Sequence, residues 1–519
     1  MLDLKIVGGT VIDGTGGPPR RADVGIAGER IADVGDLAGA EARRVLDAAG
    51  QVVCPGFIDA HSHSDTYLLI EPSAPSKVFQ GITTEVVGNC GASAAPLAGA
   101  YRLPSDWADK TYPGRWSTVA EFRRLLAEVR PAVNAVLLIG HNALRAGVVG
   151  YAGRPARPAE LQLMAARLAQ SLDEGGRGLS TGLIYPPGRY APPEEIHMLA
   201  AVAQQRGGLY ASHMRSEGQG LLDALRETIA VGRATGTRIE ISHLKTAGQA
   251  NWPLLGPALA VIEAARAEGI DVCADRYPYT ASCTDLDVVL PAWAAEGGRE
   301  AVLGRLHDPA QRARIRDELL AARPEEYWGT ITVASITHPE SRRFAGQGLA
   351  DVAAALRLEP IDALLHLIDV DELRTSAFFH GMSDENLWRI LAQPWVMLGS
   401  DASLRAPEGL LSADYPHPRA YGTCPRFLKA AVAGRTVGLP EAIRKMTSLP
   451  ARHFGLTDRG TIAIGRAADV VVFDPAQIAD CATYAAPHQL ARGVCHVLVN
   501  GVLTLSGGRF TGNRAGRVL

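Results

Sequence analysis

The sequence has little net charge and no long hydrophobic run. Its 52 basic and 55 acidic residues leave a formal net charge of −3, so no overall field favours nucleic acid or an anionic membrane. No uninterrupted apolar stretch approaches the ~20 residues that span a bilayer. The N-terminal residues 1–5 lack the basic and apolar regions of a secretory signal. We therefore expect a cytoplasmic protein with a small-molecule partner and neither a nucleic-acid nor a membrane partner; an oligomer is compatible with these features.

Cysteine is also scarce. The seven cysteines are odd in number and have no framework spacing, which argues against a disulfide scaffold. Hydrophobic residues make up 47% and charged residues 21% of the chain, as in ordinary globular proteins. A length of 519 residues exceeds one ordinary domain and suits a large barrel enzyme with an accessory domain.

The two ends of the chain have a similar sequence pattern. Short apolar bursts broken by Gly, Asp and Pro run from Leu4 to Val53, and they return in residues 469–473 and 497–504, where an Asn-Gly pair predicts a hairpin turn. We expect one small β-sandwich domain assembled from residues 1–57 and 455–519.

The long middle region alternates short apolar runs with stretches of helical periodicity. Helices are predicted at 158–174, 194–206 and 220–235, where apolar residues recur at steps of three and four. Such alternation indicates parallel strands with helical crossovers, either a (β/α)8 barrel or a doubly wound sheet. A segment around 291–345 contains a stretch rich in Arg, Glu and Ala and predicts a helical insertion.

Metal-binding side chains follow an apparent strand at 51–60. His61 and His63 are two residues apart, so on an extended chain both imidazoles point to one side and can bind one metal ion. This spacing alone is weak evidence, because a surface or core pair has the same pattern.

Four further groups each close a short apolar run: Cys90, His213, His243 and Asp401. The C-terminal ends of barrel strands converge on one mouth, where barrel enzymes carry their chemistry. The sequence therefore predicts that these side chains meet His61 and His63 in one site.

Residues 55–63 (PGFIDAHSH) and 88–91 (GNCG) resemble the amidohydrolase superfamily, specifically the D-aminoacylase (N-acyl-D-amino-acid deacylase) family. In that family a cysteine replaces the modified lysine that many other amidohydrolases use as a bridging ligand. Similar motifs cover nearly the whole chain, at 140–145, 180–185, 212–215, 242–245, 399–401, 417–419 and 445–451. The resemblance implies an α/β fold with a (β/α)8 TIM-like barrel over 58–454 beside the small β-sandwich.

The resemblance also implies the metal ligands. Cys90, His213 and His243 would hold one tightly bound zinc ion, and His61 and His63 would complete a weaker second metal position. Three protein ligands leave a coordination position open, as in catalytic zinc sites, whereas a structural site normally has a fourth protein ligand.

The chemistry implied is hydrolysis of the amide bond of N-acyl-D-amino acids to a carboxylate and a free D-amino acid. Zinc lowers the pKa of a bound water toward ~7 and polarises the scissile carbonyl, and Asp401 would act on that water as general acid/base. A helix N-cap is the alternative role for Asp401. Hydrolysis of a D-dipeptide or a cyclic amide, and a non-catalytic metal-binding protein, are the alternative functions.

Four residues form the expected binding site for the substrate carboxylate: Lys245, Tyr277, Ser282 and Arg419. Of these, Tyr277 and Arg419 resemble the carboxylate-binding residues of the family. The alternative for Lys245 and Arg419 is a solvated surface charge. A long loop at 402–416 separates Asp401 from the motif that contains Arg419, and this loop could displace Arg419.

Two further features, a loop and a histidine, bear on the expected pocket. The loop at 284–293 has no basic residue, so we expect neutral or apolar side chains on the D-amino acid. His141 is equally compatible with a structural and a functional role.

Overall fold

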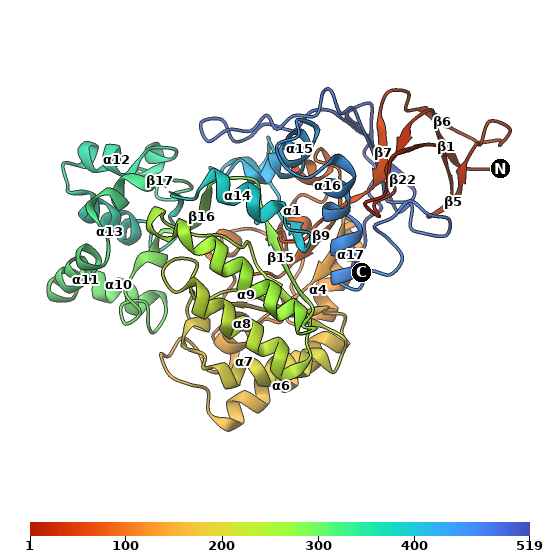
Figure 1. Ribbon diagram of the computed structural model, residues 1–519. Coiled ribbons are helices and arrows are strands. Elements are labelled where there is room, and N and C mark those ends of the chain that lie inside the picture. The colour runs from red at the N-terminus through yellow and green to blue at the C-terminus, as the bar shows by residue number, and fades with distance from the viewer.

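A computed structural model describes residues 1–519 except the side chains of residues 105 and 106. Figure 1 shows a central barrel, with the sheets formed by the chain termini on one side and a mainly helical lobe from the middle of the chain on the opposite side. Among the described residues, no helix has both the length and the apolar character needed to cross a lipid bilayer.

Eight parallel strand positions form the barrel, and each strand pairs with the next along the chain. They are β8 (Phe57–Asp59), β9 (Ile82–Val87), β10 (Asn134–Leu137) continued by β11 (Ile139–Gly140), β12 (Gly178–Gly182), β13 (Leu209–His213), β14 (Ile239–Ile241), β15 (Val272–Arg276) and β19 (Val396–Leu398). The ring closes where the Ala60 amide donates to the Leu398 carbonyl at 3.2 Å. A closed ring identifies a (β/α)8 barrel and not a doubly wound sheet.

Helices cover the outside of the barrel because each buries an apolar stripe against the strands. The predicted helices at 158–174, 194–206 and 220–235 are confirmed as α6 (Pro158–Asp173), α7 (Pro193–Gln204) and α8 (Leu221–Thr235). The others around the barrel are α1 (Tyr67–Ile70), α2 (Pro75–Val78), α3 (Ser105–Ala108), α4 (Val119–Val129), α5 (His141–Val148), α9 (Leu255–Ala267), α14 (Asp384–Leu391), α15 (Arg419–Val432) and α16 (Leu439–Met446). Helix α17 (Ser448–His453) packs over one end of the barrel.

The two termini form a β-sandwich of two sheets. One sheet has the order β5-β4-β1-β6, and the other has the order β23-β22-β21-β20-β7-β2-β3. Their strands are β1 (Leu4–Val7), β2 (Thr10–Val11), β3 (Arg20–Arg21), β4 (Asp23–Ala27), β5 (Arg30–Gly35), β6 (Val45–Asp47), β7 (Val52–Pro55), β20 (Val470–Phe473), β21 (Val494–Val499), β22 (Val502–Ser506) and β23 (Arg509–Phe510). Ile6, Val24, Val470 and Leu498 share one core between the sheets. The predicted hairpin is confirmed, since Asn500 (φ 48°) and Gly501 (φ 79°) link β21 to β22.

The lobe follows β15 and has a hydrophobic core of its own, which includes Leu290, Trp328 and Leu364. Its antiparallel sheet has the order β16-β18-β17. The elements are β16 (Ala281–Asp285), β17 (Ile331–Val333), β18 (Ser376–His380), α10 (Arg299–His307), α11 (Pro309–Ala322), α12 (Leu349–Leu356) and α13 (Pro360–Val370). The domain boundaries expected from the sequence, 1–57 with 455–519, 58–454 and an insertion around 291–345, stay a prediction.

A buried ammonium group supports the closure of the barrel. Lys77 on α2 is fully buried, and its Nζ lies 2.9 Å from Asp59 Oδ2 and 3.1 Å from Glu85 Oε2. The same Nζ donates to Ser400 Oγ at 3.1 Å. Burial lowers the pKa of Lys77, but the two carboxylates outweigh it and raise this pKa above its usual range. One charge therefore links the ends of β8 and β9 to the residues after β19.

Replacing this charge should destabilise the barrel. Lys77→Met leaves two buried carboxylates without a counter-charge, so we expect the free energy of unfolding in urea to fall by about 3–5 kcal/mol. Lys429→Met, at an exposed position on α15, is the control and should change it by no more than about 0.5 kcal/mol. Equal stability of the two variants would contradict the role assigned to Lys77.

Candidate active site

The predicted metal ligands meet at the C-terminal mouth of the barrel. Ligand atoms of Cys90, His213 and His243 all lie within 4.8 Å of one another, and a second group with the same property contains His61, His63, Cys90 and Asp401. Cys90 belongs to both groups. Residues that are far apart in the sequence are thus brought together as the strand-end rule predicted.

The distances around Cys90 suit a metal ion. Cys90 Sγ lies 3.5 Å from His243 Nε2 and 3.3 Å from His61 Nε2, and His243 Nε2 lies 3.0 Å from His213 Nδ1. Ligand atoms around a tetrahedral zinc ion are about 3.3–3.8 Å apart, given bonds of ~2.0–2.3 Å. Burial raises the pKa of the Cys90 thiol, but the neighbouring His61 and His243 outweigh it and hold this pKa well below its usual range. The donor set of one thiolate and two imidazoles fits zinc.

Left-handed backbone conformations aim the key side chains into the mouth. Cys90 (φ 52°), His243 (φ 38°) and Asp401 (φ 50°) all have positive φ, which costs a non-glycine residue about 1–3 kcal/mol. Gly88 has φ 80°, and a Cβ there would lie 2.1 Å from the Leu138 carbonyl oxygen. Gly91, with φ 77°, is similarly crowded by Asn142. The glycines on either side of Cys90 therefore allow its strained turn.

Two carboxylates that the sequence analysis missed orient the imidazoles. Asp275 Oδ2 lies 2.9 Å from His61 Nδ1, and Glu217 Oε1 lies 2.8 Å from His243 Nδ1. Each carboxylate faces Nδ1 and leaves Nε2 toward Cys90, an arrangement typical of metal-binding histidines. At His243 the Lys245 ammonium group also lies 2.8 Å from Nδ1 and is paired with the same Glu217 carboxylate. Asp275 lies near the end of β15 and could have been found by the strand-end rule, whereas Glu217 lies in a loop with no such signal.

Asp401 lies between the second metal group and a cation. Its Oδ1 is 3.2 Å from His63 Nε2 and its Oδ2 is 2.8 Å from an Arg419 guanidinium nitrogen. Burial raises the pKa of Asp401, but Arg419 and the histidines outweigh it and hold this pKa well below its usual range. The alternative role as a helix N-cap is wrong, because residues 402–409 form no helix.

The four predicted substrate residues do not all reach the cavity surface. Lys245, Ser282 and Arg419 line it, while Tyr277 is fully buried behind Arg419, whose guanidinium lies 4.5 Å from the centre of the tyrosine ring. Lys245 and Arg419 are 3% and 4% exposed, so the alternative of solvated surface charges is wrong. The loop at 402–416 leaves Arg419 beside Asp401.

The cavity is large and is shared by the barrel and the lobe. Its volume is about 2050 Å³, and Arg323, Tyr327 and Phe379 of the lobe line it together with the barrel-mouth residues. Tyr185, which the sequence analysis did not single out, lies with its ring centroid 5.0 Å from that of His213, and its hydroxyl lies 2.9 Å from that of Thr284.

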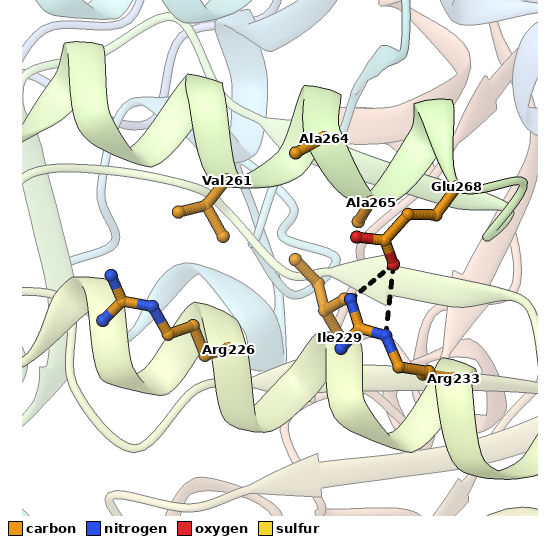
Figure 2. Close-up of a pocket in the computed structure, with 7 residues that line it drawn as sticks. All are labelled: Arg226, Ile229, Arg233, Val261, Ala264, Ala265 and Glu268. Carbon is orange, nitrogen blue, oxygen red and sulfur yellow. Dashed lines mark hydrogen bonds and ion pairs between the residues drawn. The ribbon is translucent and has the colours of Figure 1, made fainter.

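Two other features lie outside this site. His141 is buried with its Nε2 2.8 Å from Glu195 and is not among the residues that line the cavity, which favours a structural role. Figure 2 shows a small depression between α8 and α9, where Arg233 pairs with Glu268 at 2.6 Å. None of the residues around that depression belongs to a metal-binding group.

Comparisons with known proteins agree with this geometry. The amidohydrolase family model matches residues 44–505. An N-acyl-D-glutamate deacylase of Alcaligenes xylosoxydans xylosoxydans is 40% identical, over 96% of this chain and 93% of the relative.

Two solved structures are similar over the whole chain. A D-aminoacylase described as having a binuclear metal centre, with one-metal activation and second-metal attenuation, has a TM-score of 0.85 and 38% identity, and the match covers 100% of both chains. An N-acyl-D-glutamate deacylase of Bordetella bronchiseptica, in complex with zinc and a phosphonate mimic of the tetrahedral intermediate, has a TM-score of 0.86 and 36% identity, and the match covers 100% of this chain and 99% of that one. The chain belongs to the amidohydrolase family.

Proposed function

We propose that this protein is a zinc-dependent hydrolase that cleaves the amide bond of N-acyl-D-amino acids. The observation that carries the proposal is a thiolate and four imidazoles at one barrel mouth with a buried carboxylate beside them. The relatives that are 36–40% identical carry the names of such deacylases. The products are a carboxylate from the acyl group and a free D-amino acid.

Cys90, His213 and His243 are the proposed ligands of one tightly bound zinc ion. His61 and His63, with the shared Cys90 thiolate, are the proposed ligands of a weaker second metal. The bound metal supplies Lewis acidity, which polarises a carbonyl group and makes water more acidic. Glu217 and Asp275 keep His243 and His61 in the tautomer that presents Nε2 to the metal.

Asp401 is the proposed general acid/base. Because Arg419 lies 2.8 Å from it, Asp401 is ionised near neutral pH and can accept a proton from water. The water oxygen bonds to the acyl carbon, the carbon–nitrogen bond breaks, and Asp401 returns the proton to the departing amine nitrogen.

Cations in the mouth are the proposed partners of the substrate α-carboxylate. The Nε of Arg419 is buried without a hydrogen-bond partner among the described residues, so it can donate to a carboxylate. Lys245 and Ser282 line the same cavity, and Tyr277 holds the guanidinium of Arg419 from behind.

We further propose substrates with neutral or apolar side chains. The cavity wall contributed by 284–292 carries the carboxylates of Asp285 and Asp287 and the apolar side chains of Val288 and Val289. Carboxylates repel an acidic side chain, whereas valines favour an apolar one. We also propose a cytoplasmic location, which the seven free thiols support.

The central test is turnover of N-acetyl-D-leucine and N-acetyl-L-leucine, before and after chelation. We expect hydrolysis of the D-substrate only, its loss on chelation and its return with zinc. Asp401→Asn should lower kcat by about 10²–10⁴-fold because the proton carrier is removed, with the zinc content unchanged. Asp223→Asn, on the exposed face of α8, is the control and should retain full activity. Turnover unaffected by chelation would refute the proposal.

The positioning role of Glu217 predicts an effect on metal binding. Glu217→Gln should weaken zinc binding by about 10–100-fold, because His243 loses its charged acceptor. Competition with a chromophoric chelator measures the affinity. Glu268→Gln, at an exposed position immediately after α9, should leave the zinc affinity unchanged, and equal affinities in the two variants would count against the role of Glu217.

The residues of the cavity wall predict which substrate side chains the enzyme prefers. We expect kcat/KM for N-acetyl-D-leucine to exceed that for N-acetyl-D-glutamate by at least about tenfold, since a buried unpaired charge is costly. Asp287→Asn should narrow this ratio by raising the rate with the glutamate substrate. A preference for the glutamate substrate in the wild-type protein would overturn the proposed selectivity while leaving the deacylase proposal intact.

A further inference from the structure

A second group of metal-capable side chains lies at the closed end of the barrel. Helix α17 covers that end, and its Leu449 and Ala451 pack in the same core as Val86, Leu209 and Cys273 from the barrel interior. His453, the last residue of α17, is 1% exposed. The catalytic ligands lie at the other end of the strands.

Three ligand atoms converge at this end. A carboxylate oxygen of Asp271, the thiol sulfur of Cys273 and a ring nitrogen of His453 all lie within 4.8 Å of one another. Asp271 immediately precedes β15 and Cys273 lies within it, so the two side chains point to the same side of the strand. His453 approaches them from α17. This group meets the same distance criterion as the catalytic group of Cys90, His213 and His243.

Buried polar atoms around the group lack partners. Both ring nitrogens of His453 make no hydrogen bond among the described residues, although His453 Nε2 lies 2.8 Å from Glu240 Oε2. The carboxyl group of Glu240 itself lies beside that of Asp275. Glu240 on β14 is 1% exposed. A buried polar group without a partner costs about 1–3 kcal/mol. A plain hydrogen bond between Nε2 and Glu240 would still leave the other ring nitrogen of His453 unpaired.

The nearby arginines do not act as partners for the ring of His453. The Arg238 guanidinium donates to the backbone carbonyl of His453 at 2.7 Å, and that of Arg266 donates to the carbonyl of Val272. Both cations are thus directed at the backbone, and the side chain of a third nearby arginine, Arg452, is exposed. The acidic side chains beside His453 are Asp271 and Glu240.

We propose that Asp271, Cys273 and His453 form a second metal site, separate from the catalytic centre, which binds a zinc-class divalent ion. One sulfur, one nitrogen and one oxygen donor are the ligand types that zinc accepts. Glu240 is a positioning residue that holds the His453 ring. The ion joins α17 to β15 and so secures the closed end of the barrel.

The first test counts zinc per chain by mass spectrometry in the full-length wild type, Cys273→Ser and Cys54→Ser. Cys54 is a matched control, because it is also buried in a strand but belongs to no metal-capable group. We expect Cys273→Ser to hold one zinc fewer per chain than the other two proteins and to keep its hydrolase activity. Equal zinc counts in all three proteins would overturn the proposal.

The second test separates the two sites by spectroscopy and does not depend on activity. Cobalt(II) replaces zinc and gives an absorption band when it binds a thiolate. We expect Cys90→Ser to retain such a band from Cys273 and the double variant Cys90→Ser/Cys273→Ser to lose it. His453→Gln and Glu240→Gln, each in the Cys90→Ser background, should weaken the cobalt titration at least about tenfold. Absence of the band in folded Cys90→Ser would refute the proposed site.

Discussion

A single buried thiolate lies between two groups of imidazoles at the barrel mouth, with Cys90 Sγ 3.3 Å from His61 Nε2 and 3.5 Å from His243 Nε2. The other parts of the site are arranged around this contact. Neighbouring imidazoles lower the pKa of the Cys90 thiol, and its sulfur belongs to both metal-capable groups. Because Cys90 has a left-handed backbone conformation, its position depends on the close packing of the glycines beside it.

Carboxylates define what each part of the mouth can do. Asp275 and Glu217 face the histidine Nδ1 atoms and act on ring orientation. Asp401 lines the cavity, as Glu217 also does, but it is paired with Arg419 and not with a histidine Nδ1. The same functional group is thus a positioning residue in two places and a proposed proton carrier in the third, and the difference is set by the neighbouring atoms.

The lobe contributes part of the cavity wall and, among the described residues, none of the metal-capable groups. It has its own hydrophobic core, and its Tyr327 and Phe379 line the cavity together with the residues of the barrel mouth. Substitution of lobe residues that line the cavity, such as Asp287, can therefore change the proposed substrate preference while the strands and their ligands remain unchanged.

The sequence by itself determined the strand–helix alternation, the hairpin with its Asn-Gly turn and the polar residues at strand ends, including Asp401, because each rests on a local pattern. The alternation left a barrel and a doubly wound sheet open. The resemblance to the D-aminoacylase family implied the barrel and the set of metal ligands, and the closed ring of strands in the structure decided for the barrel. The sequence did not reveal Glu217 or the burial of Tyr277 behind Arg419. Those features depend on contacts between residues distant in the chain, which no local period encodes. The left-handed backbone at Cys90, His243 and Asp401 likewise arises only when packing at the barrel mouth forces it.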